Sequence, residues 1–316
     1  MNQEDSRRER ILIAGIGALA TLFAARLAQA GHSVTMLGTW ADGLHALRRN
    51  GARLVDAHGR EARYSVSVSD DPRDLQGAMF ALVLVKSWQT ERAARQLRVC
   101  LDGEGLALTL QNGLGNREIL AANLGQERVA LGSTTTGATL LGPGLAKPGG
   151  EGVVSIEAHS RLGPLKRALA SADFQIEVVE DARTLIWSKL VVNSAINPLT
   201  AILRIPNGQL LERPAARGLL RALAKETAAV ASAKKIRLAL SDPVRMVENV
   251  ALRTASNHSS MFQDVQRGAP TEIDAICGAV ARAGEQHNVP TPMNHACWKL
   301  VQALSQSPAY RSGAAT

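Results

Sequence analysis

A lysine and two asparagines share one face of a predicted helix. The segment IWSKLVVNSAINPLTAI, residues 186–202, places Lys189, Asn193 and Asn197 four residues apart, one above another. Because aliphatic side chains rather than other charges flank this stripe, we interpret it as the wall of a cleft, with Lys189 as the candidate for chemistry. The alternative is a buried helix whose polar groups bond the neighbouring backbone.

Two later segments add polar groups. The segment TEID, residues 271–274, carries Glu272 just after Pro270 and is predicted to begin a helix that runs from about residue 272 to residue 287. The simpler interpretation of Glu272 is an acid in the first helical turn that complements the helix dipole. The segment NHSSMFQD, residues 257–264, offers a side-chain amide and hydroxyls between predicted helices.

These residue types suit the reduction of a ketone. Hydride transfer builds negative charge on the carbonyl oxygen, and a protonated lysine within hydrogen-bond distance stabilises that charge and can donate the proton. A desolvated lysine tends to lose its charge at neutral pH, and a carboxylate such as Glu272 would counter that tendency. Our hypothesis is that Glu272 tunes Lys189 and bonds substrate or ribose. Asparagine and serine can hold a carboxylate and a hydroxyl without adding a competing charge.

The N-terminal region carries the pattern of a dinucleotide-binding unit. A buried strand, RILIA, is followed at once by GIGALA, residues 15–20, and then by a helix-like apolar segment. Gly15 would permit a tight turn, Gly17 the close approach of backbone to pyrophosphate, and Ala20 the packing of helix near strand. The phosphates would bind at the N-terminus of that helix.

Cofactor choice depends on the end of the next predicted strand, LGTW, residues 37–40. An NAD enzyme is expected to place an acid there, and an NADP enzyme often places an arginine there. Neither is present, since Asp42 comes slightly too late and Arg48 and Arg49 lie on the next predicted helix. The missing acid favours NADPH and leaves NADH open.

Further apolar runs predict a parallel sheet. Lys86 ends the run AMFALVLVK, Asn112 ends the run GLALTLQNG, and the segment RVALGSTTTGATL passes through residues 132–138. Open α/β sheets bind ligands at the carboxyl ends of their strands, so we expect these ends and the glycine turn to converge on one crevice. The alternatives are an exposed lysine at a strand end and a turn asparagine before glycine. Residues 142–152, GPGLAKPGGEG, are predicted as a loop.

The predicted fold class is α/β: an N-terminal Rossmann-type doubly wound sheet over residues 1–180, followed by an all-helical C-terminal domain over residues 181–316. The alternation of strands and helices stops near residue 180, and helical patterns follow. A chain of 316 residues with 46% hydrophobic residues suits two domains. With only 3% aromatic residues, the cores must be built from Ala, Leu, Val and Ile.

Composition argues against other classes of partner. The net charge of +8 comes without a basic run interleaved with aromatics, so we expect no nucleic acid, although a basic surface favours anionic substrates. The uncharged run of residues 11–25 is shorter than the roughly 18 to 20 residues of a spanning helix, so no membrane is expected. The three cysteines show no metal-ligand spacing, which predicts no metal and reduced thiols in a cytoplasmic protein.

Taken in order, the motifs GIGALA, VKSWQT, QNGLGN, IWSKLVVNSAINPLTAI with IPNGQL, NHSSMFQD and PTEIDAI closely resemble the ketopantoate reductase (2-dehydropantoate 2-reductase) family. The resemblance spans residues 10–300. It implies reduction of the 2-keto acid 2-dehydropantoate with NADPH, on the way to pantothenate, by a Rossmann domain joined to a helical domain. The nicotinamide would then lie in the crevice between the domains.

The resemblance also implies roles for individual residues. Lys189 falls on the catalytic lysine of the family and Glu272 on its second essential residue. The implied substrate-binding residues are Asn112, Asn193, Asn197, Asn207, Asn257 and Ser260. The implied cofactor-binding residues are Gly15, Ile16, Gly17, Ala18, Leu19, Ala20, Lys86, Asn112, Ala138 and Glu272. Ala20 replaces the usual third glycine, and with the missing arginine it bears on the NADPH preference rather than on the reaction.

Three alternative functions are open for the chain. One is an NAD(P)H-dependent reductase of a different 2-keto acid. Another is a β-hydroxyacid dehydrogenase, which also pairs a catalytic lysine with an asparagine four residues on, but whose glycine-rich substrate loop has no match here. The third is a non-catalytic redox sensor, which would have no reason to retain Lys189 together with Glu272. A homodimer is compatible with a helical domain of this kind.

Overall fold

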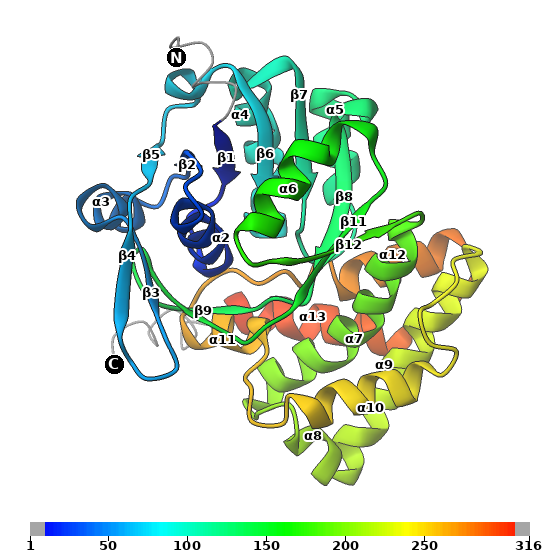
Figure 1. Cartoon of the computed structure of the whole chain (residues 1–316). Helices are drawn as coiled ribbons and strands as arrows, with labels where there is room; N and C mark the ends of the chain where they lie inside the picture. Colours follow the sequence, from blue (N-terminus) through cyan, green and yellow to red (C-terminus); the bar gives the residue numbers. More distant parts are fainter. Residues whose placement is uncertain (1–9, 307–316) are drawn as a thin grey trace. The chain divides into compact units, whose positions relative to one another are not determined.

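The computed structural model describes residues 10–306, which fold into two compact units (Figure 1). The first unit holds the chain up to Gln111 together with Asn116–Ala182, and the second holds Asn112–Gly115 and the chain from Arg183 onward. This division lies close to the boundary expected at residue 180. The short segment Asn112–Gly115, which follows a strand of the first unit, belongs with the second.

The first unit is built on an eight-stranded sheet. Its strands in chain order are β1 (Ile11–Ala14), β2 (Val34–Leu37), β5 (Ser67–Ser69), β6 (Ala78–Val83), β7 (Leu101–Thr109), β8 (Val129–Thr134), β11 (Val153–Glu157) and β12 (Gln175–Val179). They lie in the order β12-β11-β8-β7-β6-β1-β2-β5. All neighbours pair in parallel except β8 and β11. The carboxyl ends of β1, β2 and β6 therefore meet at one edge of the sheet.

Helices cover both faces of this sheet. Its helices are α2 (Ala18–Gln29), α3 (Ala41–Asn50), α4 (Thr90–Cys100), α5 (Asn116–Leu124) and α6 (Gly163–Ser171), with short 3-10 helices η1 (Pro72–Leu75), η2 (Ser87–Gln89), η3 (Gln126–Arg128) and η4 (Ser160–Leu162). Side chains of α2, α3 and α6 pack on one face, and those of α4 and α5 on the other. Figure 1 shows α2 and α6 in front of the strands and α4 behind them. The predicted doubly wound α/β fold is confirmed.

A second, four-stranded sheet was not predicted from the sequence. It consists of β3 (Ala52–Val55), β4 (Glu61–Tyr64), β9 (Ala138–Gly142) and β10 (Leu145–Pro148), in the order β4-β3-β10-β9. The single strand predicted for RVALGSTTTGATL is wrong, because the segment divides between β8 and β9, which lie in different sheets. The predicted loop of residues 142–152 contains β10. Pairing with the distant β3 outweighs the glycine-rich composition of that segment, because strand formation depends strongly on context.

The second unit is helical, as predicted. Its helices are α7 (Ala182–Leu203), α8 (Gln209–Glu212), α9 (Pro214–Ala233), α10 (Pro243–Arg253), α11 (Ser260–Gln266), α12 (Cys277–Gln286) and α13 (Pro292–Gln306). Their shared core includes the buried residues Trp187, Leu190, Leu220, Val247 and Val280. Across residues 10–306, we find no helix with the length and apolar composition that crossing a membrane requires.

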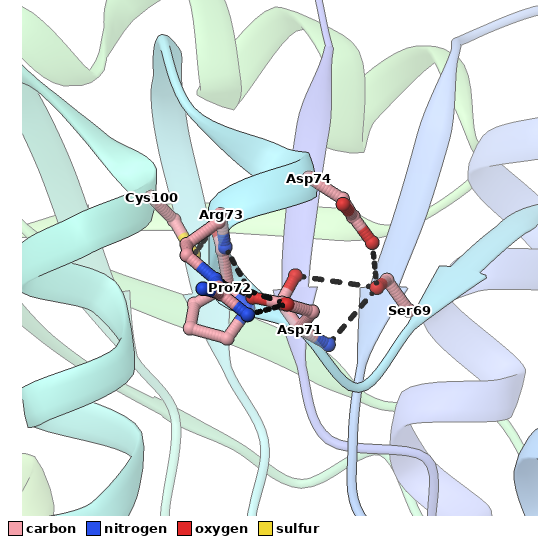
Figure 2. A network of polar contacts seen from close by, with 6 residues as sticks. All are labelled: Ser69, Asp71, Pro72, Arg73, Asp74 and Cys100. Atoms are coloured by element: carbon pink, nitrogen blue, oxygen red, sulfur yellow. Dashed lines mark hydrogen bonds and ion pairs between the residues drawn. The ribbon is translucent and has the colours of Figure 1, made fainter.

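A polar network fixes the turn after β5 at the edge of the large sheet (Figure 2). Asp71 accepts a hydrogen bond from the backbone N–H of Arg73 at 2.9 Å, which caps η1, and its Oδ2 also binds the Arg73 guanidinium at 2.6 Å. The Ser69 hydroxyl donates to Asp74 at 2.8 Å. These contacts close a tight turn on the surface and hold none of the predicted site residues.

Candidate active site

Helix α7 carries the predicted polar stripe. Lys189, Asn193 and Asn197 stand on one face of this 22-residue helix; the first two are partly buried, and Asn197 is 6% exposed. Pro198 lies inside the helix and has no backbone N–H, so the carbonyl of Ser194 lacks its usual helical donor. The Cys277 thiol, at the start of α12, donates to that carbonyl at 3.6 Å. The proline therefore creates a point of attachment between α7 and α12.

The environment of Lys189 changes its charge equilibrium. Burial lowers the pKa of Lys189 from 10.5 to about 8, and the negative charge of Glu272 raises it part of the way back. Lys189 is therefore protonated at neutral pH, but it releases its proton far more readily than an exposed lysine. A group with these properties can donate a proton to a developing alkoxide.

Glu272 lies in a turn rather than in a helix. The backbone N–H groups of Ala275 and Ile276 both donate to the Glu272 carbonyl at 3.1 Å, and α12 begins only at Cys277. The helix predicted from about residue 272 is therefore wrong at its start, because Ile276 adopts φ −102° and ψ −95°, which interrupts any helix there. Glu272 is 5% exposed, so its side chain is almost completely removed from solvent.

The segment Asn112–Gly115 docks on this turn. The Asn112 Nδ2 donates to Glu272 Oε2 at 3.4 Å, and the Leu114 N–H donates to the Ala275 carbonyl at 2.9 Å. Gly113 has φ +83°, and a Cβ there would lie 2.5 Å from the Ala275 oxygen, so the approach requires glycine. The structure thus brings Asn112, Glu272 and Lys189 together.

The remaining predicted substrate residues lie around the loop between α10 and α11. The Asn207 N–H donates to the Asn257 carbonyl at 3.0 Å, and its Nδ2 donates to Thr254 at 2.9 Å. Within residues 10–306, the buried Oδ1 of Asn207 has no hydrogen-bond partner. The structure therefore joins Asn207 to Asn257, and it leaves one buried acceptor of Asn207 unsatisfied.

The start of α11 contacts the end of α7. Ser259 is buried, caps α11, and meets the Thr200 hydroxyl at 2.7 Å, while Thr200 also donates to the Asn197 carbonyl at 3.0 Å. The next residue, Ser260, is exposed. These contacts place the first turn of α11 against the part of α7 that carries Asn197, with the Ser260 hydroxyl accessible.

The glycine turn of the first unit has the geometry of an anion site. Gly15 has φ +134°, and a Cβ there would lie 3.1 Å from the Leu84 carbonyl, so the turn needs glycine. Gly17 precedes α2 without a side-chain cap, and the first turn of α2 holds no acid. Ala20 is fully buried, which agrees with its predicted role in packing helix near strand. The free N–H groups at this helix end suit a pyrophosphate.

Two further predicted cofactor residues lie at different places in the first unit. Lys86 follows β6 at the same sheet edge as Gly15 and precedes η2, where its carbonyl accepts from the Gln89 N–H at 2.8 Å. Ala138 instead begins β9 in the four-stranded sheet. The prediction of one strand passing through residues 132–138 is therefore wrong, because β8 ends at Thr134 and Ala138 belongs to the other sheet.

Sequence reasoning overlooked the aromatic residue after β2. Trp40 is 38% exposed, and a Cβ on Gly43 would lie 2.5 Å from its ring, so the indole rests on that glycine at the start of α3. Ile16 fits over Gly38 in the same way, since a Cβ there would lie 2.6 Å from Ile16. The sequence signal for this contact is an aromatic residue three positions after the end of β2, in the segment LGTW.

A cavity of about 480 Å³ in the first unit does not coincide with these residues. Its lining comprises Arg10, Thr35, Arg48, Ser67, Val68, Ser69, Asp70, Asp74 and Leu75. Arg48 is already paired with Asp70 at 2.7 Å. The chemistry described above therefore lies elsewhere.

Comparisons with known proteins agree with the two-unit architecture. Residues 11–161 match the family described as "Ketopantoate reductase PanE/ApbA", and residues 181–305 match "Ketopantoate reductase PanE/ApbA C terminal". A protein of Halobacterium salinarum named 2-dehydropantoate 2-reductase is 34% identical over 298 residues, 93% of this chain and 98% of that protein. One of Archaeoglobus fulgidus with the same name is 35% identical over 303 residues, 94% of this chain and 98% of its own.

Solved structures give the same result. The crystal structure of a PanE/ApbA family ketopantoate reductase from Ralstonia eutropha JMP134 is similar with a TM-score of 0.87 and 31% identity, covering 94% of this chain and 98% of its own. The ternary structure of D-mandelate dehydrogenase with NADH and anilino(oxo)acetate is similar with a TM-score of 0.88 and 25% identity over the same shares. This chain therefore belongs to the ketopantoate reductase PanE/ApbA family.

Proposed function

We propose that this chain reduces 2-dehydropantoate to pantoate with NADPH, and that Lys189 donates the proton. The observation that carries the proposal is the partly buried Lys189, whose pKa of about 8 is set by burial and by Glu272. It occurs in a chain whose curated relatives are named 2-dehydropantoate 2-reductase over nearly their full length.

The proposed reaction balances with a single lysine. A reduced nicotinamide, when bound, would supply the hydride that reduces C2 of the keto acid and leaves an alkoxide on the carbonyl oxygen. The Lys189 ammonium donates its proton to that oxygen and is reprotonated from solvent. Glu272 keeps the lysine charged until the transfer, because its negative charge raises the pKa that burial lowers.

The other polar residues would hold the two ligands. Asn193 and Asn197 project from the face of α7 that carries Lys189, so their amides can bind the substrate carboxylate and hydroxyl. The unsatisfied Asn207 Oδ1 would accept from a substrate hydroxyl, and the accessible Ser260 would donate to a substrate oxygen. Asn112 and Glu272 would contact substrate or ribose.

The glycine turn fits the cofactor. Gly15 and the uncapped start of α2 would hold the pyrophosphate, Lys86 would neutralise part of its charge, and the Trp40 indole would contact the adenosine. Neither an acid nor an arginine follows β2 directly. We therefore expect only a modest preference for NADPH over NADH, because the segment after β2 has no acid to bind the ribose hydroxyls and no arginine to bind the 2′-phosphate.

A second candidate function is the reduction of a different 2-keto acid with NADH. The similarity to D-mandelate dehydrogenase, solved with NADH and anilino(oxo)acetate, favours this possibility. It uses the same lysine chemistry and differs in the cofactor and in the substrate group beyond the keto acid.

A substrate panel separates the two candidates. We would assay 2-dehydropantoate, a short aliphatic 2-keto acid and an aryl 2-keto acid, each with NADPH and with NADH. The expected result is the highest kcat/KM for 2-dehydropantoate with NADPH. A higher kcat/KM for the aryl acid with NADH would establish the second candidate instead, and turnover of none would defeat both.

The proposal extends to the setting of the reaction. Pantoate formation places the chain in pantothenate biosynthesis, and its three buried, unpaired cysteines are compatible with the reducing cytoplasm. A homodimer remains a prediction, which sedimentation at micromolar concentration would test.

A further inference from the structure

The turn that carries Glu272 needs support from outside itself. Residues 271–276 precede α12 and make no regular helical ladder, so a carboxylate on this turn keeps its position only if neighbouring elements hold the backbone. Leu114 and Gly113 hold it on one side through Ala275, as described above. The other side is held at Asp274.

Asp274 is bound by three donors from two helices. Its Oδ1 accepts from the Trp298 indole N–H at 2.7 Å and from the Gln302 side-chain amide at 2.8 Å, both on α13. Its backbone carbonyl accepts from the Arg282 guanidinium of α12 at 2.8 Å. We refer to Asp274, Trp298, Gln302 and Arg282 as the Asp274 latch.

The indole of the latch is itself fixed in place. A Cβ on Gly278 would lie 2.8 Å from the Trp298 ring, so the ring rests directly on the backbone of α12. The Arg282 guanidinium carbon lies 5.2 Å from the ring centroid and the Lys299 ammonium 4.0 Å from it. These contacts therefore fix the orientation of the Trp298 indole N–H that donates to Asp274.

We propose that the Asp274 latch positions Glu272 for the reaction: Trp298 and Gln302 donate hydrogen bonds to Asp274 and so hold Glu272, two residues earlier in the chain, where it faces Lys189. The inference rests on the proposed function of Lys189 and Glu272. Asp274 is exposed and touches no reacting atom in this scheme, so it acts through Glu272.

The hydrogen-bond pattern distinguishes positioning from a direct effect of charge. Both side-chain donors end on the same oxygen, Asp274 Oδ1. The amide of asparagine offers one such oxygen, so Asp274→Asn keeps the two hydrogen bonds and removes the negative charge. Asp274→Ala removes the hydrogen bonds and the charge together. The elements around Glu272 carry several titratable or charged groups: Arg183 and Lys189 on α7, Cys277, Arg282 and Glu285 on α12, and His295, Cys297 and Lys299 on α13. Of these, Lys189 is the group whose pKa responds to the charge of Glu272.

The test compares four variants of the full chain in the reductase assay. For Asp274→Ala and Trp298→Phe we expect kcat to fall roughly three- to tenfold, the scale of one or two net hydrogen bonds, with a smaller change in KM. The basic limb of their pH profiles should move to lower pH, because Glu272 then opposes the desolvation of Lys189 less. Asp274→Asn should restore both quantities to near wild type. His295→Ala, which removes an edge contact to the same ring (5.8 Å between ring centroids) at a side chain not bonded to Asp274 or Gln302, is the matched control.

Two results would overturn the inference. If Asp274→Asn shifts the limb as far as Asp274→Ala, the charge of Asp274 acts directly on Lys189 and the latch is not a positioning device. If Asp274→Ala lowers only the melting temperature and leaves the limb in place, its contacts stabilise the fold and do no more.

A second measurement separates this inference from the proposed function. Labelling of Lys189 by acetic anhydride, followed by peptide mass analysis across pH, reports the pKa of Lys189 without turnover. If the substrate panel shows no reduction, the proposed function fails, yet a lower pKa in Asp274→Ala with a wild-type value in Asp274→Asn still supports the latch. An unchanged pKa in Asp274→Ala overturns the latch even in an active reductase.

Discussion

The Asp71–Arg73 pair of the first unit and the Glu272–Lys189 pair of the second both join a carboxylate to a cation, but different forces set their charges. Asp71 and Arg73 are two residues apart on a surface turn, and the Arg73 side chain is 80% exposed (Figure 2). Hydrogen bonds from Arg73 lower the pKa of Asp71 to about 2 and raise the pKa of Arg73. Both groups therefore stay charged throughout the range in which enzymes work.

Glu272 and Lys189 come from segments far apart in the chain, and burial rather than hydrogen bonding dominates. Burial lowers the pKa of Lys189 to about 8, and Glu272 only moderates that effect. Hydrogen bonds thus keep the exposed pair charged at every working pH, whereas burial brings the pKa of Lys189 close to the neutral range.

The largest expected effect is that of Lys189→Ala. Removal of the proton donor should lower kcat for keto acid reduction by roughly 10²- to 10⁴-fold, the usual contribution of a general acid. Arg73→Ala removes the cation of the exposed pair and should leave kcat unchanged. Steady-state kinetics of both variants, with circular dichroism to confirm folding, make the test. Undiminished turnover by Lys189→Ala would contradict the mechanism.

The wild-type pH profile should show the titration of Lys189. Because its pKa is lowered to about 8, Lys189 is protonated below that pH, and its capacity to donate a proton is lost as the pH rises through 8. Well above this value kcat/KM for reduction should fall about tenfold per pH unit, while oxidation of the hydroxy acid, which needs the neutral amine, should gain over the same interval. Both directions can be followed by nicotinamide absorbance. If kcat/KM for reduction stays constant up to pH 10, a residue other than Lys189 donates the proton.

An intermediate effect is expected for Glu272→Gln. Loss of the negative charge leaves desolvation unopposed, so the pKa of Lys189 should fall further below 8 and the basic limb should move to lower pH. Turnover at pH 8 should drop by roughly tenfold or more, because less lysine is then protonated. Asp71→Asn, the same change of charge in the exposed pair, is the matched control and should leave the limb in place. A limb that does not move in Glu272→Gln would show that Glu272 does not tune Lys189.

The difference between contacts within one segment and contacts between distant segments also explains which features of the molecule the sequence predicts. The stripe on α7 and the turn at Gly15 depend on spacing within a few residues, so both appear where the pattern places them. The turn of Glu272 reads as a helix start in sequence, because its actual shape depends on Leu114 and on α13, which lie far away in the chain. Strand β10 was missed for the same reason, since its pairing with β3 joins segments that no local pattern connects. Local periodicity thus predicts the placement of Lys189 on its helix. The contacts that hold the Glu272 carboxylate near it are seen only in the structure.

The smallest effect is expected for the stability of Asp71→Asn. The folded pKa of Asp71, about 2, lies below its ordinary value of 3.8, so the carboxylate stabilises the fold fully above 3.8 and loses that contribution as the pH falls towards 2. Asparagine can still cap η1, so only the charge pair with Arg73 is lost, and exposed pairs contribute little. The melting temperature of Asp71→Asn should lie slightly below that of wild type near neutral pH, and the two should converge in acid. Thermal unfolding at several pH values would check this, and a difference that persists unchanged into acid would mean that the network in Figure 2 acts through its shape rather than its charge.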